Sequence, residues 1–126
     1  YHQEELAYNY RMDGIQGAVL CVKLRHLPAW TAARRRLAGL YRARLAALPE
    51  IGLLDVAPAA DPVWHVFAIR HAARDTLREE LAAAGIQTGL HYPLPLHLQP
   101  SFAALGGRLG QCPAAEALAA EQLSLP

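Results

Sequence analysis

The stretch Val63-Trp64-His65-Val66-Phe67-Ala68-Ile69-Arg70 decides the fold class that the sequence predicts. It is rich in β-branched and aromatic residues, which favour a strand. Apolar residues stand on both of its alternating faces, so we expect a strand that is largely covered on both sides. Such a strand needs neighbouring strands and helices, which must come from this chain, from a further segment or from a partner.

Three further elements are expected towards the C-terminus: an amphipathic helix over 75–84, a second strand over 86–92 and a last helix over 114–123. Gly85 suits the left-handed residue that commonly ends a helix. Pro93 and Pro95 stop the second strand because proline has no backbone amide to donate. Pro113 is typical of a first helical position, so the last helix is expected to open there.

Two helical segments are expected before the strand. Asp13 can accept hydrogen bonds from the free amides of a helix that begins beside it. The apolar residues that follow cover more than half of the helix circumference, which predicts a buried or interface helix. Pro28 should cause a kink or short break before the helical pattern resumes over 30–48. Residues 49–62 contain three prolines and are expected to form a connecting loop.

Composition and charge narrow the function classes. The chain has 126 residues, of which 53% are hydrophobic and 18% charged, and this is typical of a folded globular segment. A net charge of +1 gives no overall reason to expect nucleic acid, and no apolar run is long enough to span a membrane. Cys21 and Cys112 lie far apart with no metal-ligand spacing, which suits a reducing, cytoplasmic setting and predicts no metal site.

A basic stretch lies between Asp13 and Glu50. It contains one lysine and six arginines without an acidic residue, namely Lys23, Arg25, Arg34, Arg35, Arg36, Arg42 and Arg44. Such a run favours a solvated helix face, although a phosphate-bearing ligand or partner is the alternative. Lys23 is the single lysine of the chain, so any mechanism that needs a lysine amine has one candidate here.

Two clusters of polar residues are candidate binding sites. Tyr8-Asn9-Tyr10-Arg11-Met12 combines phenols, an amide and a guanidinium next to a predicted helix start, which suits an oxyanion such as phosphate. His91-Tyr92-Pro93-Leu94-Pro95-Leu96-His97-Leu98-Gln99-Pro100 displays polar side chains on a rigid loop, which suits a hydroxyl-rich or phosphorylated ligand. Purely local roles, in aromatic packing, a salt bridge or satisfied histidines, remain the alternative for both.

These clusters and the end of the chain resemble a known family. The matching segments are Tyr8-Asn9-Tyr10-Arg11-Met12-Asp13-Gly14-Ile15-Gln16, Gly85-Ile86-Gln87-Thr88-Gly89-Leu90-His91-Tyr92-Pro93 with Pro95-Leu96-His97-Leu98-Gln99-Pro100, and Leu123-Ser124-Leu125-Pro126. They are similar to the C-terminal part of the nucleotide-sugar aminotransferases of the DegT/DnrJ/StrS family. The resemblance implies the fold-type I architecture of aspartate aminotransferase, pyridoxal 5'-phosphate as cofactor, and a homodimer with active sites shared across the interface.

The resemblance also implies roles for individual residues. It assigns Asn9 to the cofactor phosphate in the partner's site, with Arg11 supporting that region. It places four residues beside the substrate, namely Tyr8, His91, Tyr92 and His97. No catalytic residue is assigned within the chain, because the family's Schiff-base lysine lies upstream and Lys23 follows the Asn-x-Arg motif.

We therefore predict a mixed α/β chain of the α+β kind, with a long kinked helix followed by a small sheet that carries helices. Residues 1–48 are expected to form an interdomain motif and long helical segments, and 49–126 a small C-terminal domain truncated at its end. The complete enzyme would transfer an amino group from Glu or Gln to a nucleotide-linked keto sugar, while this chain alone would be inactive. The alternatives are a keto-sugar dehydratase, a cyclitol aminotransferase, or a non-catalytic anion-binding or regulatory module.

Overall fold

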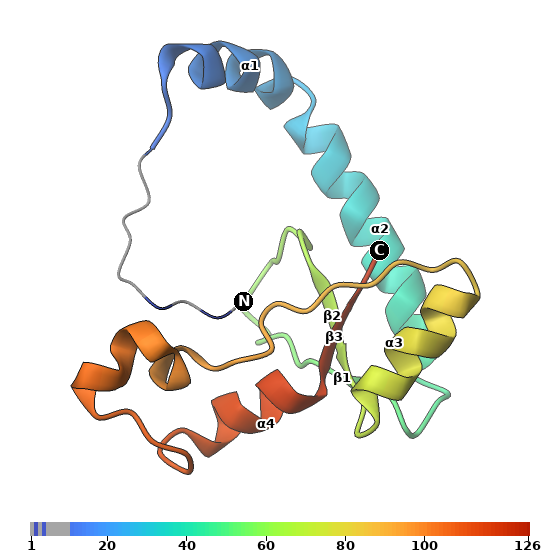
Figure 1. Ribbon diagram of the computed structural model, residues 1–126. Helices are drawn as coiled ribbons and strands as arrows, with labels where there is room; N and C mark the ends of the chain where they lie inside the picture. The colour runs from blue at the N-terminus through green and yellow to red at the C-terminus, as the bar shows by residue number, and fades with distance from the viewer. Residues whose placement is uncertain (1, 3, 5–10) are drawn as a thin grey trace.

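The computed structural model describes His2, Glu4 and residues 11–126. Its elements are α1 (Gly14–Leu24), α2 (Leu27–Leu45), β1 (Gly52–Leu53), β2 (Phe67–Arg70), α3 (Arg74–Ala83), the short helices η1 (Leu96–Leu98) and η2 (Pro100–Leu105), α4 (Pro113–Glu121) and β3 (Gln122–Leu125). The strands form one antiparallel sheet in the order β1-β2-β3 (Figure 1). The predicted combination of a kinked helix and a small sheet with helices is confirmed.

Helix α1 begins where the sequence predicts and is followed by the predicted break. Asp13 Oδ1 accepts from the Gln16 amide at 2.7 Å, and Gln16 Oε1 accepts from the Asp13 amide at 3.1 Å, which completes a capping box. The helix ends at Leu24, and α2 starts at Leu27 with Pro28 in its first turn. Figure 1 shows α1 held away from the sheet at the far end of α2.

The apolar face of α1 is exposed within this chain. None of the residues of α1 is buried, and Ile15, Val19 and Val22 are all more than half exposed. The expectation of a buried helix is therefore wrong for the chain by itself, because the sheet packs against α2 instead. The alternative expectation, an interface helix, stays a prediction.

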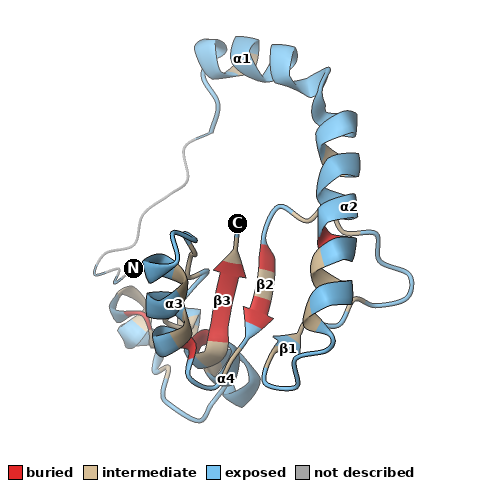
Figure 2. Ribbon diagram, turned by 90° about the vertical axis from the view of Figure 1, so that its right-hand side faces the viewer, coloured by how far each residue is buried: buried red, intermediate tan, exposed pale blue. Residues whose placement is uncertain are grey.

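The core lies where α2 packs against the sheet. Phe67 and Ile69 of β2 and Leu123 of β3 are buried together with Ala38 of α2 (Figure 2). Tyr41 of α2 stacks on Phe67 with ring centroids 4.9 Å apart. Helix α2 thus shares a core with the sheet, although the predicted division between 1–48 and 49–126 stays a prediction.

Helix α3 agrees closely with the prediction for 75–84. It runs from Arg74 to Ala83, and Gly85 follows it in the left-handed conformation with φ of +79°. The Ile86 amide donates to the Leu81 carbonyl at 2.8 Å, and the Gly85 amide donates to the Ala82 carbonyl at 2.9 Å. These two bonds form the Schellman arrangement that satisfies the carbonyls of the last helical turn.

Three predictions need correction, namely those for one strand, one loop and one helix. The strand expected over 63–70 begins only at Phe67, because Trp64 has a positive φ of +51° that interrupts the extended backbone. The loop expected over 49–62 contains β1, which pairs with the end of β2. The helix expected over 114–123 ends at Glu121, because the residues that follow pair with β2 as β3 instead.

The second strand expected over 86–92 is also wrong, because only Gly89 pairs with β3. Gly89 exchanges both backbone hydrogen bonds with Ser124, at 3.0 and 2.8 Å. The next pair would join His91 to Gln122, but the His91 amide donates to the side-chain oxygen of Gln122 at 3.0 Å. The Gln122 carbonyl accepts from Arg74 at 3.2 Å instead, so the ladder stops after one bridge.

None of the helices in the described part of the chain has the length and apolar character that a membrane span requires.

Candidate functional site

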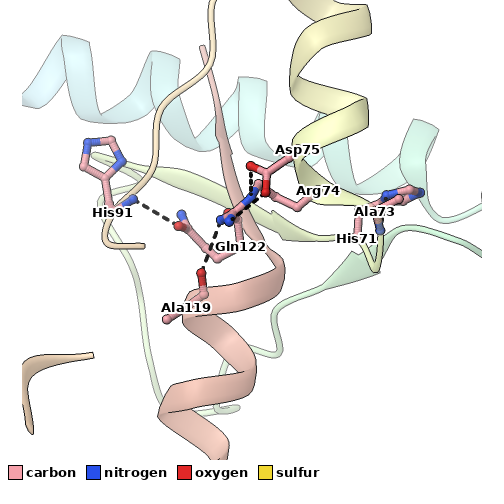
Figure 3. Close-up of polar contacts among 7 residues, drawn as sticks. All are labelled: His71, Ala73, Arg74, Asp75, His91, Ala119 and Gln122. Carbon is pink, nitrogen blue, oxygen red and sulfur yellow. Dashed lines mark hydrogen bonds and ion pairs between the residues drawn. The ribbon is translucent and has the colours of Figure 1, made fainter. Parts of the chain in front are cut away.

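His91 is held by β3 through both its backbone and its ring. Its amide donates to Gln122 Oε1 at 3.0 Å, and its Nδ1 lies 3.0 Å from the hydroxyl oxygen of Ser124 (Figure 3 shows the amide contact). Gln122 Nε2 donates to the same hydroxyl oxygen at 2.6 Å. Gln122 and Ser124 are each only 4% exposed, so buried groups fix the position of an imidazole that itself reaches solvent.

Arg74 anchors the turn from which Gln122 projects. Its side chain is 9% exposed, and Nη1 donates to the carbonyls of Ala119 and Gln122, each at 3.2 Å (Figure 3). Its Nε lies 2.8 Å from Oδ1 of the exposed Asp75, which provides the opposite charge. A continuous set of contacts therefore runs from the start of α3 through the junction of α4 and β3 to His91.

A small cavity lies beside His91. Its volume is about 230 Å³, and its lining includes His65, Gln87, Gly89 and Ser124 as well as His91. A Cβ at position 89 would lie 2.8 Å from Cε1 of the His91 ring, so any larger residue there would displace the imidazole. Polar side chains on a concave surface next to an exposed imidazole are suited to binding a ligand through its oxygen atoms.

Tyr92 extends the same surface outwards. Its side chain is exposed, and its ring meets that of His91 edge to face, with centroids 5.7 Å apart and an angle of 74°. The structure thus brings the predicted residues His91 and Tyr92 together on one surface. An exposed aromatic ring beside an imidazole offers both an apolar face and hydrogen-bonding groups.

His97 lies in different surroundings. Its Nε2 is 3.0 Å from Oε1 of Glu116 on α4, and both side chains are mostly buried. It lines a second cavity of about 450 Å³, together with Phe102 and Cys112 among others. His91 and His97 therefore face separate cavities, and the role of His97 beside the substrate stays a prediction.

Glu116 is stabilised in its ionised form. Both of its oxygens accept from the Gly110 amide, at 3.0 and 2.9 Å, and Oε1 also accepts from the Cys112 amide at 3.1 Å. These bonds, that of Gly110 first, together with the nearby His97, lower the pKa of Glu116 below its ordinary value of 4.5. The carboxylate therefore closes the loop before α4 and holds His97 at the same time.

We expect the loss of the Glu116 carboxylate to lower the free energy of unfolding at neutral pH and not in acid. Because its pKa is lower in the folded than in the unfolded chain, ionised Glu116 stabilises the fold above the ordinary carboxyl pKa. This contribution is lost as the pH falls through the lowered value. Glu116→Gln should therefore lower the urea midpoint at about pH 7, and its difference from the wild type should shrink on acidification. The exposed Glu79→Gln is the control, and a difference that persists in acid would contradict the prediction.

The N-terminal cluster is described only in part. Tyr8 and Asn9 lie outside the described residues, so their predicted roles are untested. Arg11 is exposed just before α1, beside a groove of about 780 Å³ that Met12 and Lys23 also line. Arg11 and Lys23 lie at opposite ends of α1, so the groove has a cationic residue at each end.

Two of the arginines in the basic stretch are used within the fold. Arg35 forms an ion pair with Asp61 at 2.6 Å, and Arg42 donates to the Leu54 carbonyl at 2.9 Å. Both contacts tie α2 to the loop between β1 and β2. This use disfavours the interpretation of the whole stretch as an anion-binding surface.

Sequence reasoning missed Arg74, Gln122 and Ser124 as members of the site around His91. The sequence gives Arg74 and Ser124 no site role, and Gln122 falls within the helix expected over 114–123. A signal was present, since Gln122 and Ser124 alternate with Leu123 and Leu125 at the period of a strand. Ser124 also belongs to the segment Leu123-Ser124-Leu125-Pro126 that resembles the family, whereas Gln122 lies directly before it.

The comparisons with known proteins define first the class and then the family. The structure is similar to the crystal structure of DesV from Streptomyces venezuelae in complex with a ketimine intermediate, with a TM-score of 0.87 and 47% identity over 100% of this chain and 34% of that one. The chain therefore has the fold of part of an aminotransferase. Residues 1–126 match the DegT/DnrJ/EryC1/StrS aminotransferase family, and the chain belongs to that family.

Two further matches extend the comparison. The chain is 47% identical to dTDP-3-amino-3,4,6-trideoxy-alpha-D-glucose transaminase of Streptomyces venezuelae, covering 100% of this chain and 33% of that protein. A putative sugar aminotransferase of Streptococcus pneumoniae, Spr1654 in its PLP-form, has a TM-score of 0.79 at 26% identity over 95% of this chain and 32% of that one. The chain thus spans about a third of the length of its curated relatives.

Proposed function

We propose that this chain is the C-terminal part of a pyridoxal phosphate-dependent aminotransferase subunit. The subunit transfers an amino group from Glu or Gln to a keto sugar carried on a nucleotide. The match of all 126 residues to a dTDP-sugar transaminase at 47% identity carries the proposal. The relative's sugar is attached to dTDP, so we propose a nucleotide-linked substrate for this protein as well.

The described residues suit the edge of a cofactor site. Arg11 offers an exposed guanidinium next to the amino end of α1, and this donor chemistry fits a phosphate group. Pyridoxal phosphate, when bound, supplies the electron sink for the reaction. The role of Arg11 is to bind and orient the phosphate, and we assign Asn9 to the same group. Lys23 stands at the other end of an exposed helix, so the reacting amine is assigned to a segment outside this chain.

The surface around His91 is proposed to bind the sugar nucleotide. The imidazole of His91 is held from β3 while its outer edge stays exposed, and Tyr92 lies against it. Tyr8 and His97 are assigned to the border of the same substrate region in the complete enzyme. This arrangement orients the substrate and does not itself perform the chemical step.

A homodimer with shared active sites is part of the proposal. The exposed apolar side chains of α1 support it, because Ile15, Val19 and Val22 would otherwise face water together. Cys21 and Cys112 are exposed and unpaired, which suits a reducing cytoplasm. We therefore place the working enzyme in the cytoplasm as a dimer.

The proposed function predicts that catalysis needs the complete subunit. The complete subunit, supplied with pyridoxal phosphate, glutamate and a dTDP-linked keto sugar, should produce 2-oxoglutarate and the amino sugar. The 126-residue chain alone should produce neither. Arg11→Met should raise the pyridoxal phosphate concentration for half-maximal activity about tenfold or more, because a charge-assisted hydrogen bond is lost.

Arg25→Met is the matched control for this measurement. Arg25 is exposed at the other end of α1, so its loss should leave the cofactor requirement unchanged. Absence of 2-oxoglutarate from the complete subunit with several nucleotide-linked keto sugars would contradict the proposed function. A covalent cofactor adduct on Lys23 of the isolated chain would contradict the placement of the reacting amine elsewhere.

A further inference from the structure

We propose that Gln122 and Ser124 hold the neutral imidazole of His91 in its Nε2–H tautomer. His91 would then present a hydrogen-bond donor, and not a base, to a ligand in the adjacent cavity. The ligand group that fits is an acceptor oxygen, such as a hydroxyl, carbonyl or phosphate oxygen. Its identification as a substrate oxygen rests on the proposed function, whereas the tautomer follows from contacts within the chain.

The hydrogen-bond partners of Gln122 fix the orientation of its side-chain amide. The backbone amide of His91 can only donate, so the group of Gln122 that lies 3.0 Å from it must be the carbonyl oxygen Oε1. The nitrogen Nε2 then faces Ser124 at 2.6 Å, and it can only donate as well. Ser124 Oγ is therefore an acceptor in this contact.

The hydrogen of the Ser124 hydroxyl points to Nδ1 of His91. Ser124 is 4% exposed, so its O–H needs an acceptor inside the protein. Nδ1 of His91, 3.0 Å from Oγ, is the acceptor that the described residues offer. If Nδ1 carried the hydrogen instead, the hydrogen of the buried Ser124 hydroxyl would have no acceptor among the described residues.

The contact with Ser124 determines which nitrogen of His91 carries the hydrogen. In a neutral imidazole one nitrogen accepts and the other carries the hydrogen. Since Nδ1 accepts from Ser124, Nε2 carries the hydrogen. Ser124 and Gln122 are thus positioning residues, which act on a ligand only through the His91 ring and its orientation.

The test measures the tautomer directly. The complete subunit is labelled with ¹⁵N-histidine, and the ring nitrogens of His91 are assigned by their loss in His91→Asn. At about pH 8, where an ordinary imidazole is neutral, we expect a protonated Nε2 and a bare Nδ1. A protonated Nδ1 in the wild type would overturn the proposal.

Gln122→Glu provides the sharpest variant because it keeps the shape of the side chain. A carboxylate can still accept from the His91 amide, but it cannot donate to Ser124. The Ser124 hydroxyl should then donate to the new carboxylate and accept from Nδ1, so the tautomer of His91 should be reversed. An unchanged tautomer in folded Gln122→Glu would overturn the proposal.

A control separates this relay from the effect of charge alone. Gln87→Glu adds the same carboxylate to the wall of the cavity, whereas the hydrogen bonds of the Ser124 hydroxyl join it to His91 and Gln122, so this substitution should leave the tautomer unchanged. If Gln122→Glu does not fold, Ser124→Ala tests the proposal in its place. Removal of the hydroxyl should allow both tautomers of His91 to be populated. A ring that keeps the Nε2–H form alone in Ser124→Ala would overturn the proposal.

Kinetics test the role of the donor in binding. Ser124→Ala should raise the KM for the sugar nucleotide about threefold to tenfold with a smaller change in kcat. Ser124→Thr keeps the hydroxyl group, so its KM should equal that of the wild type. An unchanged KM would overturn the assignment of the donor to the substrate. A wild-type subunit without transamination, but with the Nε2–H signal, would contradict the proposed function and support the tautomer.

Discussion

Leu123→Ala is expected to lower the free energy of unfolding by about 2 to 5 kcal/mol. Leu123 is 0% exposed and pairs in register with Ile69, so it lies at the centre of the core. The substitution removes buried methyl groups and leaves a cavity. Urea unfolding followed by tryptophan fluorescence would measure the loss as a lower midpoint with an unchanged slope.

The cavity left by Leu123→Ala should not collapse. Strand β3 is paired with β2 along one edge and bridged to Gly89 on the other, so its backbone cannot move inwards without breaking hydrogen bonds. Leu105→Ala is the control, since Leu105 is 79% exposed and its loss should change stability by less than about 0.5 kcal/mol. Equal effects of the two substitutions would contradict the placement of the core.

Elements with strong local signals could be predicted from the sequence. The cap at Asp13, the break near Pro28 and the left-handed Gly85 each depend on residues a few positions apart. Capping, proline geometry and the freedom of glycine act locally, so no tertiary contact is needed to predict them. The helices they bound are accordingly close to the predicted ranges.

Elements that depend on distant partners could not be predicted. Gln122–Leu125 follows an alanine-rich helix, and helix propensity favours continuation, but pairing with β2 makes it a strand. The segment around Gly89 has strand character, yet its ladder ends where Arg74 and the Gln122 side chain take the backbone groups of the next pair. Tertiary contacts therefore decide both outcomes.

In the candidate site, too, the sequence indicates some residues directly, while others depend on distant partners. The family resemblance identified His91 and Tyr92, which the structure brings together on one surface. The supporting partners of His91 lie more than thirty positions away on β3, so spacing in the sequence does not reveal them. His97 lies only six positions after His91, but it belongs to the short helix η1 and contacts Glu116 of α4.

Arg74→Met is expected to lower the free energy of unfolding by about 2 to 4 kcal/mol, because it leaves two buried carbonyls without their donor. Arg74 is 9% exposed, and methionine can fill most of the space without supplying hydrogen bonds. Its ion-pair partner Asp75 is 70% exposed, so water can solvate the carboxylate that remains. The cost therefore comes mainly from the carbonyls of Ala119 and Gln122.

Two variants separate this role of Arg74 from its charge. Arg78→Met removes an exposed guanidinium from the same helix and should change stability by less than about 0.5 kcal/mol. Arg74→Lys keeps the charge but replaces the planar guanidinium, so it should recover only part of the loss. Full recovery by lysine in urea unfolding would show that charge suffices, and it would contradict the anchoring of the α4–β3 junction by the guanidinium. Partial recovery would instead tie the position of Gln122, and through it that of His91, to the start of α3.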